Sequence, residues 1–218
     1  MENIDLPAMN PFAVSEDGNF YAQSLPDAWK DALQSTFPLV WELLEKSNTY
    51  LAGGLLRSMV AEEPLSPEAT DIDLFFNSDY TYQAVKKYLA KIDGMNKIFQ
   101  CPEDKLVTFK DDVTGWKYQC IAVDFYPSLF SVVNSFDFTC TCFGAHPDYF
   151  IFHKDAISDA LSKNLRWNKI TYPSSSMRRM MKYARKGYTM AQSEYQYFVD
   201  CVSSHHPDIA DYQLVYVD

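Results

Sequence analysis

The stretch YLAGGLLRSMVAEEPLSPEATDIDLFF, residues 50–76, decides the fold of this chain. It begins as an apolar strand that runs into Gly53 and Gly54, continues as a short helix and a polar loop, and ends in a second strand. That strand opens with Asp71 and Asp73, whose side chains are expected on one face because side chains alternate along a strand. A glycine pair before a helix lets backbone amides approach a phosphate. Two carboxylates beside such a turn are what magnesium-dependent phosphoryl or nucleotidyl transfer requires.

Simpler interpretations of the same residues stay open. A pair of aspartates two apart is often the solvated end of a strand, and a pair of glycines is often only a turn. Here Leu74, Phe75 and Phe76 follow directly, so the pair opens a strongly apolar strand. Two unpaired carboxylates there repel each other, and a cation partner explains their proximity. We therefore expect Asp71 and Asp73 to bind Mg2+ or Mn2+.

Length and composition allow one sizeable domain, or a domain with a helical appendage. The chain has 218 residues, of which 47% are hydrophobic and 16% aromatic. No apolar run is long enough to span a bilayer, and residues 1–26 lack the pattern of a signal peptide, so no membrane partner is expected. Five cysteines predict reduced thiols and a cytoplasmic protein. Cys140, Cys142 and His146 lack the second ligand pair of a zinc site, which favours buried structural thiols.

Charge is spread unevenly along the sequence. The net charge of −10 argues against a broad nucleic-acid surface. Eight of the nineteen basic residues nevertheless fall in residues 163–186: Lys163, Arg166, Lys169, Arg178, Arg179, Lys182, Arg185 and Lys186. This run is either a solvated helix face or a surface that faces a nucleotide or RNA. On a helix over 174–190, apolar residues recur at steps of three and four and are expected to pack inward: Met177, Met180, Met181 and Ala184.

The order of predicted elements indicates an α+β fold, a mixed β-sheet flanked by helices with a short helical C-terminal extension. Helices are expected over 27–46 (where Pro38 can kink or split the helix), 81–92, 127–135 and 155–163. Strands are expected over 49–52, 72–76, 97–100, 106–110, 116–125, 137–143 and 149–152. The strand over 116–125 carries Asp124, which either faces water at a strand end or completes a two-metal site with the other two aspartates.

Five segments in order resemble the catalytic head of the polymerase-β-type nucleotidyltransferases, in particular the bacterial CCA-adding enzyme and poly(A) polymerase group. The segments are GGLLRS at 53–58, TDIDLFF at 70–76, SFDFTCTCFGA at 135–145, HKDAISDALSKNLR at 153–166 and SMRRMMKYARKGYTM at 176–190. They cover residues 48–190, most of the chain. Five motifs in the same order are a far more specific signal than any one of them.

The resemblance implies a nucleotidyltransferase (polymerase β-like) fold over residues 27–172, preceded by an acidic arm at 1–26 and followed by a helical extension at 173–218. It implies NTP, most simply ATP or CTP, as substrate, with RNA or tRNA, a protein or a small molecule as acceptor. The residues implied to hold metal and carry catalysis are Asp71, Asp73 and Asp124. The residues implied to bind the nucleotide are Gly53, Gly54, Arg57, Asp137, Arg178, Arg179, Lys182 and Arg185.

Departures from the family pattern suggest a second interpretation. Ser58 stands in place of an aspartate, Ser135 and Phe136 replace an arginine pair that contacts the triphosphate, and Cys142 replaces an asparagine. The family's base-selecting neck and its tRNA-holding body and tail are largely missing after the arginine helix. The alternative is a catalytically impaired protein that binds a nucleotide or a protein partner. Its partner surfaces would be the acidic arm and the aromatic residues Tyr195, Tyr197, Phe198, Tyr212 and Tyr216.

Overall fold

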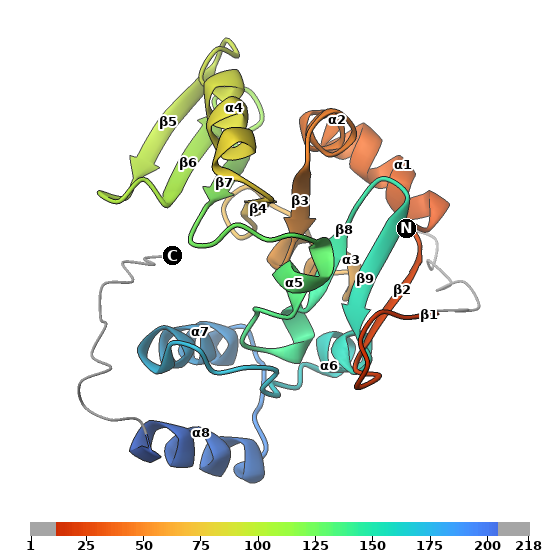
Figure 1. Ribbon diagram of the computed structural model, residues 1–218, viewed down its shortest axis with the longest axis vertical. Coiled ribbons are helices and arrows are strands. Elements are labelled where there is room, and N and C mark those ends of the chain that lie inside the picture. Colours follow the sequence, from red (N-terminus) through yellow and green to blue (C-terminus); the bar gives the residue numbers. More distant parts are fainter. Residues whose placement is uncertain (1–11, 205–218) are drawn as a thin grey trace.

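A nine-stranded mixed sheet forms the centre of the molecule (Figure 1). The computed structural model describes residues 12–204, so residues 1–11 of the expected arm, and Tyr212 and Tyr216, lie outside the described residues. Across the sheet the strands are β1 (Phe12–Ala13), β2 (Phe20–Ser24), β9 (Tyr149–His153), β8 (Phe143–Ala145), β3 (Thr49–Ala52), β4 (Ile72–Phe76), β7 (Lys117–Ile121), β6 (Leu106–Asp111) and β5 (Met95–Gln100). Among these strands, β4 and β7 run parallel and the other neighbours antiparallel. The expected α+β fold with a mixed sheet is confirmed.

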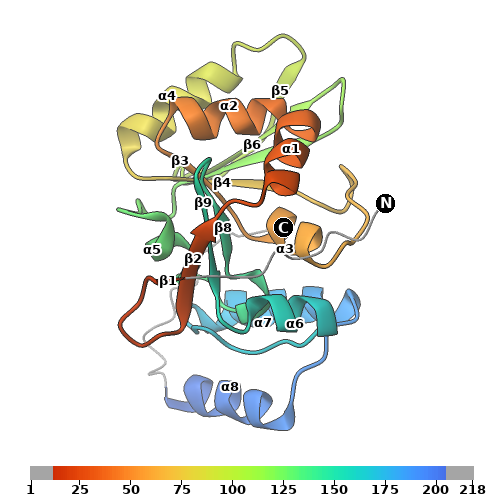
Figure 2. The ribbon, with the colours of Figure 1, turned by 90° about the vertical axis from the view of Figure 1, so that its right-hand side faces the viewer.

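Helices cover both faces of the sheet and extend beyond one of its ends. They are α1 (Asp27–Thr36), α2 (Pro38–Lys46), α3 (Gly54–Val60), α4 (Asp79–Leu89), α5 (Leu129–Val133), α6 (Ala156–Ser162), α7 (Pro173–Arg185) and α8 (Gln192–Ser204), with a 3-10 turn at Thr139–Thr141. Figure 2 shows α1, α2 and α4 at one end of the molecule, α6 and α7 at the other, and α8 outermost. None of the described helices combines the length and apolarity needed to cross a bilayer.

Pro38 splits the helix that was expected over 27–46. Phe37 leaves the helical conformation with φ −129°, and Pro38 then begins α2, where its missing N–H costs nothing because the first amides of a helix have no partner inside it. Both helices bury apolar residues against the same face of the sheet, including Leu33 and Val40, which are fully buried. The break therefore redirects the chain without removing either helix from the core.

Three apolar clusters hold the layers together. The largest cluster packs the helices α1, α2, α3, α4 and α6 against one face of the sheet. A second cluster packs α5 against the other face. A third cluster links the 3-10 turn to the C-terminal helices through Phe138, Trp167, Tyr188 and Phe198, with the Trp167 and Phe198 rings stacked at 5.2 Å. This last cluster fixes α7 and α8 to the body of the protein.

Two segments differ from the predicted elements. Residues 20–24 of the expected arm form β2, which pairs with β9 and is therefore part of the sheet. The expected strand over 137–143 is mostly the 3-10 turn, followed by the short strand β8. The division of the chain at residues 26 and 172 stays a prediction.

Candidate functional site

The turn between β3 and α3 lies directly against Asp73. Gly53 has φ +89°, a left-handed conformation that glycine adopts without strain. A side-chain carbon placed on Gly53 would lie 3.4 Å from the Asp73 Oδ2 atom and 3.7 Å from the Phe136 ring. The bare backbone of this turn thus permits a close approach to the carboxylate, and the turn opens into a cavity of about 550 Å³.

The cavity collects most of the residues that the sequence singled out. The predicted site residues that line it are Gly53, Gly54, Arg57, Asp71, Asp73, Asp124, Asp137, Arg179 and Lys182. They come from β4 and the residue before it, from the turn before α3 and α3 itself, from the loops after β7 and α5, and from α7. Segments more than a hundred residues apart in sequence therefore meet in one volume. Arg178 and Arg185 are exposed and do not line the cavity, so their expected place in the site is wrong.

The two strands that were expected to carry the aspartates, β4 and β7, are neighbours in the sheet. The three carboxylates, however, do not converge. In the parallel pair of β4 and β7, Asp73 lies opposite Gln119. The chain leaves β7 at Ile121, so Asp124 lies in the following loop, where it is exposed and its Oδ1 accepts a hydrogen bond from the Phe125 amide at 2.7 Å. Within residues 12–204 no three carboxylate, imidazole or thiol groups are placed to hold a metal. The expected three-carboxylate site is therefore corrected to the Asp71 and Asp73 pair.

This pair still fits a magnesium ion, because such ions are commonly held by one or two carboxylates together with substrate phosphates. Gln119 lies opposite Asp73 in the strand pair and lines the same cavity. Lys117, two residues before Gln119 on β7, has its Nζ atom 3.6 Å from the Asp71 Oδ1 atom. Asp71 therefore has a protein cation next to it, while Asp73 lies nearer the glycine turn.

Arg57 is buried and bound by protein groups. Its guanidinium donates to the Glu63 carboxylate at 2.7 Å, to the Tyr188 hydroxyl at 3.0 Å and to Ser58 at 2.9 Å. The guanidinium also lies 5.7 and 5.6 Å from the ring centres of Tyr183 and Tyr188. Burial alone would lower the pKa of Arg57, but these tyrosines and Glu63 raise it above its ordinary value. Arg57 thus connects α3 to the end of α7, so this residue, expected only to bind the nucleotide, also holds two parts of the fold together.

Helix α7 forms a basic wall of the cavity. Arg179 donates to Asp137 at 2.5 Å, and Lys182 and Lys186 line the cavity beside it. Burial lowers the pKa of Lys186, and the nearby positive charges of Arg57 and Lys182 lower it further. Several cations held close together in this way create a strong preference for an anion.

Of the four residues predicted to pack inward from this helix, only Met180 packs against an apolar cluster, the third one. Met177 and Met181 are about half exposed, at 49% and 48%, and Ala184 is exposed as well. Ser175 and Ser176 are buried in their place. The helix covers a polar cavity as well as the third apolar cluster, so Lys182 faces the cavity while Met177 and Met181 face outward.

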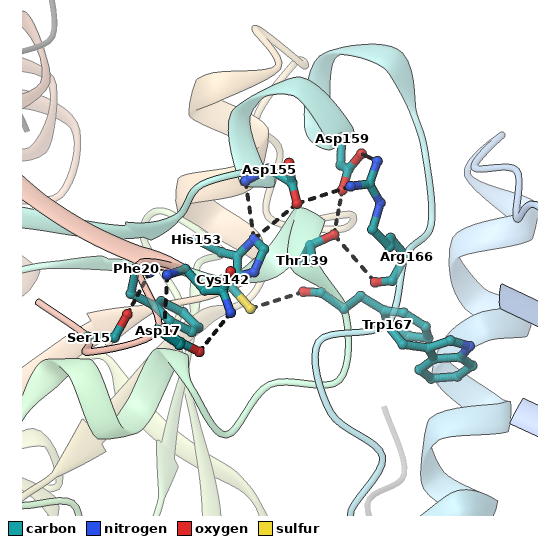
Figure 3. A network of polar contacts seen from close by, with 12 residues as sticks. Ser15, Asp17, Phe20, Thr139, Cys142, His153, Asp155, Asp159, Arg166 and Trp167 are labelled. Carbon is teal, nitrogen blue, oxygen red and sulfur yellow. Dashed lines mark hydrogen bonds and ion pairs between the residues drawn. The ribbon is translucent and has the colours of Figure 1, made fainter. Parts of the chain in front are cut away.

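A buried polar network supports the 3-10 turn that begins at Thr139, two residues after Asp137 (Figure 3). Asp159 on α6 is fully buried and accepts a 2.6 Å hydrogen bond from the Thr139 hydroxyl. Arg166 reaches Asp159 at 3.4 Å and Asp155 at 3.0 Å, so the buried carboxylate has a counter-ion. The sequence pointed to these residues only through motif resemblance, and the structure shows that they hold the 3-10 turn in place.

Some cavity residues were missed by sequence reasoning. Gln119, Tyr126 and Asn134 line the same cavity. Lys186, which belongs to the basic run identified in the sequence, also lines it, two helical turns after Arg179. Cys140 and Cys142, expected as structural thiols, are buried, and burial raises the pKa of Cys140 to about 12.

Comparisons with known proteins place this geometry in a family. Residues 20–163 match the family described as Gabija anti-defense 2 family protein. Gabija anti-defense 2 from Bacillus phage SPbetaL7 is 28% identical over 158 residues, which are 71% of this chain and 37% of that protein. Among solved structures, a CCA-adding enzyme with ATP is similar with a TM-score of 0.60 and 13% identity, over 84% of this chain and 46% of that chain.

The Thermotoga maritima CCA-adding enzyme complexed with tRNA is similar with a TM-score of 0.59 and 12% identity, again over 84% and 46% of the two chains. At such low identity these structures show the fold, which is that of the CCA-adding nucleotidyltransferases. The chain spans less than half the length of each of these relatives. The family match extends over more than half of the chain, and the protein belongs to the Gabija anti-defense 2 family.

Proposed function

We propose that this protein is a metal-dependent nucleotidyltransferase that moves NMP from an NTP to an acceptor hydroxyl and releases pyrophosphate. The observation that supports it is the division of charge inside one cavity. Asp71 and Asp73 lie on the β4 side, Arg179 and Lys182 lie on α7, and Lys186 directly follows α7. A metal-bound nucleotide needs both halves, because carboxylates bind the cation and basic side chains bind the phosphates.

Each part of the site then has a chemical role. Asp71 and Asp73 would hold Mg2+ or Mn2+, which supplies charge neutralisation at the transferring phosphate. The backbone of Gly53 and Gly54 and the cations of α7 would hold the triphosphate. The acceptor oxygen forms a bond to the α-phosphorus as the bond to the β-phosphate oxygen breaks, and Asp124 at the rim orients the hydroxyl and accepts its proton.

Substrates and setting are proposed from the relatives. The structures of CCA-adding enzymes include complexes with ATP, with CTP and with tRNA, so ATP or CTP is the proposed donor and RNA or tRNA a proposed acceptor. A protein hydroxyl is the other proposed acceptor, because the net charge of −10 disfavours a broad RNA surface. The family name adds the proposal that the protein acts against Gabija defence in the host cytoplasm.

A second candidate function is nucleotide or protein binding without transfer. The observation that favours it is Lys117, whose ammonium group lies 3.6 Å from Asp71 and competes with a metal for that carboxylate. Phe136 also lies beside the glycine turn where the resembling family carries an arginine. Under this candidate the cavity would bind an NTP but release it unchanged.

Adjacent arginines on α7 provide a matched test of the leading proposal. The protein is incubated with each α-labelled NTP, magnesium or manganese, and total RNA or protein, and labelled product is measured. Arg179→Ala and Asp73→Asn should each reduce labelling by at least tenfold, whereas Arg178→Ala, outside the cavity, should label as the wild type does. NTP binding without any labelled product would favour the second candidate. Equal loss in Arg178→Ala and Arg179→Ala would contradict the role assigned to the cavity.

A further inference from the structure

A row of aromatic rings lines the cavity next to the candidate metal ligands. Phe75 is two residues after Asp73 on β4 and therefore shares its face. The Phe75 ring lies 5.6 Å from the Phe136 ring and 6.0 Å from the Tyr126 ring, measured between centroids. Phe136 and Tyr126 are both partly exposed within the cavity. The row presents flat apolar surface to a bound molecule immediately beside Asp73.

Two amide side chains line the same volume with unused hydrogen-bonding groups. The Asn134 side chain ends α5, and the Gln119 side chain lies opposite Asp73 in the strand pair. Both residues line the cavity, and neither side-chain amide hydrogen-bonds to any residue in the described part of the chain. Each amide offers one donor group and one acceptor group side by side, which matches the edge of a nucleobase.

The combination of rings and amides selects the kind of ligand. A purely apolar molecule would leave the two amides without partners, which is unfavourable once water is excluded. A phosphate placed here would meet aromatic rings, whereas the basic side chains of Lys182 and Lys186 lie on and just after α7. A planar heteroaromatic ring satisfies both features, since it stacks on aromatic side chains and presents polar atoms at its edge.

We propose that Phe75, Tyr126 and Phe136, with Asn134 and Gln119, form a subsite for a nucleobase. This inference rests on the proposed function in placing the phosphates at α7 and the glycine turn. The ring is the base of the NTP or the terminal base of a nucleic-acid acceptor. Both sources offer the same chemistry, and the experiment separates them.

Isothermal titration with two kinds of probe tests the two halves of the cavity independently. Adenosine, cytidine, guanosine and uridine probe the base subsite, and magnesium tripolyphosphate probes the phosphate half. Phe136→Ala should weaken nucleoside binding about tenfold, within the range of one lost stacking contact, and should leave tripolyphosphate binding unchanged. Asn134→Ala should change the order of preference among the four nucleosides. Tyr80→Leu, on α4 and 84% exposed, is the control and should bind all probes as the wild type does.

The outcomes distinguish the subsite from the proposed function. Absent nucleoside binding, or binding equal in wild type and both variants, overturns the subsite even if tripolyphosphate binds. Nucleoside binding that is lost in Phe136→Ala, without tripolyphosphate binding, supports the subsite and contradicts the transferase. If the base belongs to the NTP, the wild type binds ATP more tightly than tripolyphosphate, and Phe136→Ala removes that difference. If Phe136→Ala still binds ATP more tightly than tripolyphosphate but binds a dinucleotide more weakly than the wild type does, the base belongs to the acceptor.

Discussion

Replacing Arg57 with alanine is expected to destabilise the protein strongly, although the residue lies in the candidate site. The side chain is 2% exposed, and removing it leaves the Glu63 carboxylate without its main partner. Breaking a buried ion pair costs about 3–5 kcal/mol. Glu63 is 23% exposed and keeps Lys163 at 3.7 Å, which favours the lower end, about 3 kcal/mol. Loss of the contacts with Tyr183 and Tyr188 adds about 1 kcal/mol.

A total of about 4 kcal/mol corresponds to a fall in melting temperature of roughly 8–16 °C for a chain of this size. Thermal unfolding followed by circular dichroism measures it, and urea unfolding gives the free energy directly. Arg185→Ala, an exposed arginine on α7, is the matched control and should change the stability by less than about 0.5 kcal/mol. A melting temperature of Arg57→Ala within a degree or two of the wild type would refute the reasoning and return Arg57 to a purely ligand-binding role.

Three further predictions concern other parts of the fold. Gly144→Ala places a carbon 2.6 Å from the Leu129 side chain, and this overlap should lower the free energy of urea unfolding by about 1–3 kcal/mol. Burial lowers the pKa of His153 below 6.5, so just below that pH the unfolded chain binds more protons than the folded one. The free energy of unfolding should therefore fall on acidification from about pH 7 to pH 5. His153→Gln should make this fall shallower. Asp137→Asn should weaken the hydrogen bond that Asp137 accepts from Arg179 and leave that arginine less fixed. The affinity for magnesium tripolyphosphate should then change more than the melting temperature does. An unchanged affinity would contradict a role of Asp137 in positioning Arg179.

Local sequence patterns predicted the parts of the fold that depend on neighbouring residues. The strand with Asp71 and Asp73 and the glycine turn before it were predicted correctly, because alternation and glycine act over a few residues. The strand Phe20–Ser24 was not predicted, because it pairs with β9, about 130 residues later in the chain, and nothing near it indicates that partner. Long-range pairing of this kind carries no local signal.

The candidate site shows the same limit at the level of single side chains. Asp124 was assigned to a strand on apolar pattern, but β7 ends at Ile121, and a shift of this size changes where a side chain points. The methionines of α7 follow helical spacing, yet Met177 and Met181 face outward and only Met180 packs inward, because the helix also covers a cavity whose polarity comes from other segments. Periodicity identifies a distinct face of a helix, and only the surroundings decide whether that face is buried.

The cavity draws its negative wall and its positive wall from different parts of the chain. The carboxylates are on β4 and at its start, in the middle of the sheet, and the cations are on α7 and at its end. Helix α7 is held through Arg57, Tyr188 and the contact between Arg179 and Asp137. A ligand that spans both walls can bind only when α7 is docked, so its binding free energy adds to that of docking. Ligand occupancy then becomes visible far from the bound molecule, as slower amide hydrogen exchange and slower proteolysis in residues 173–204.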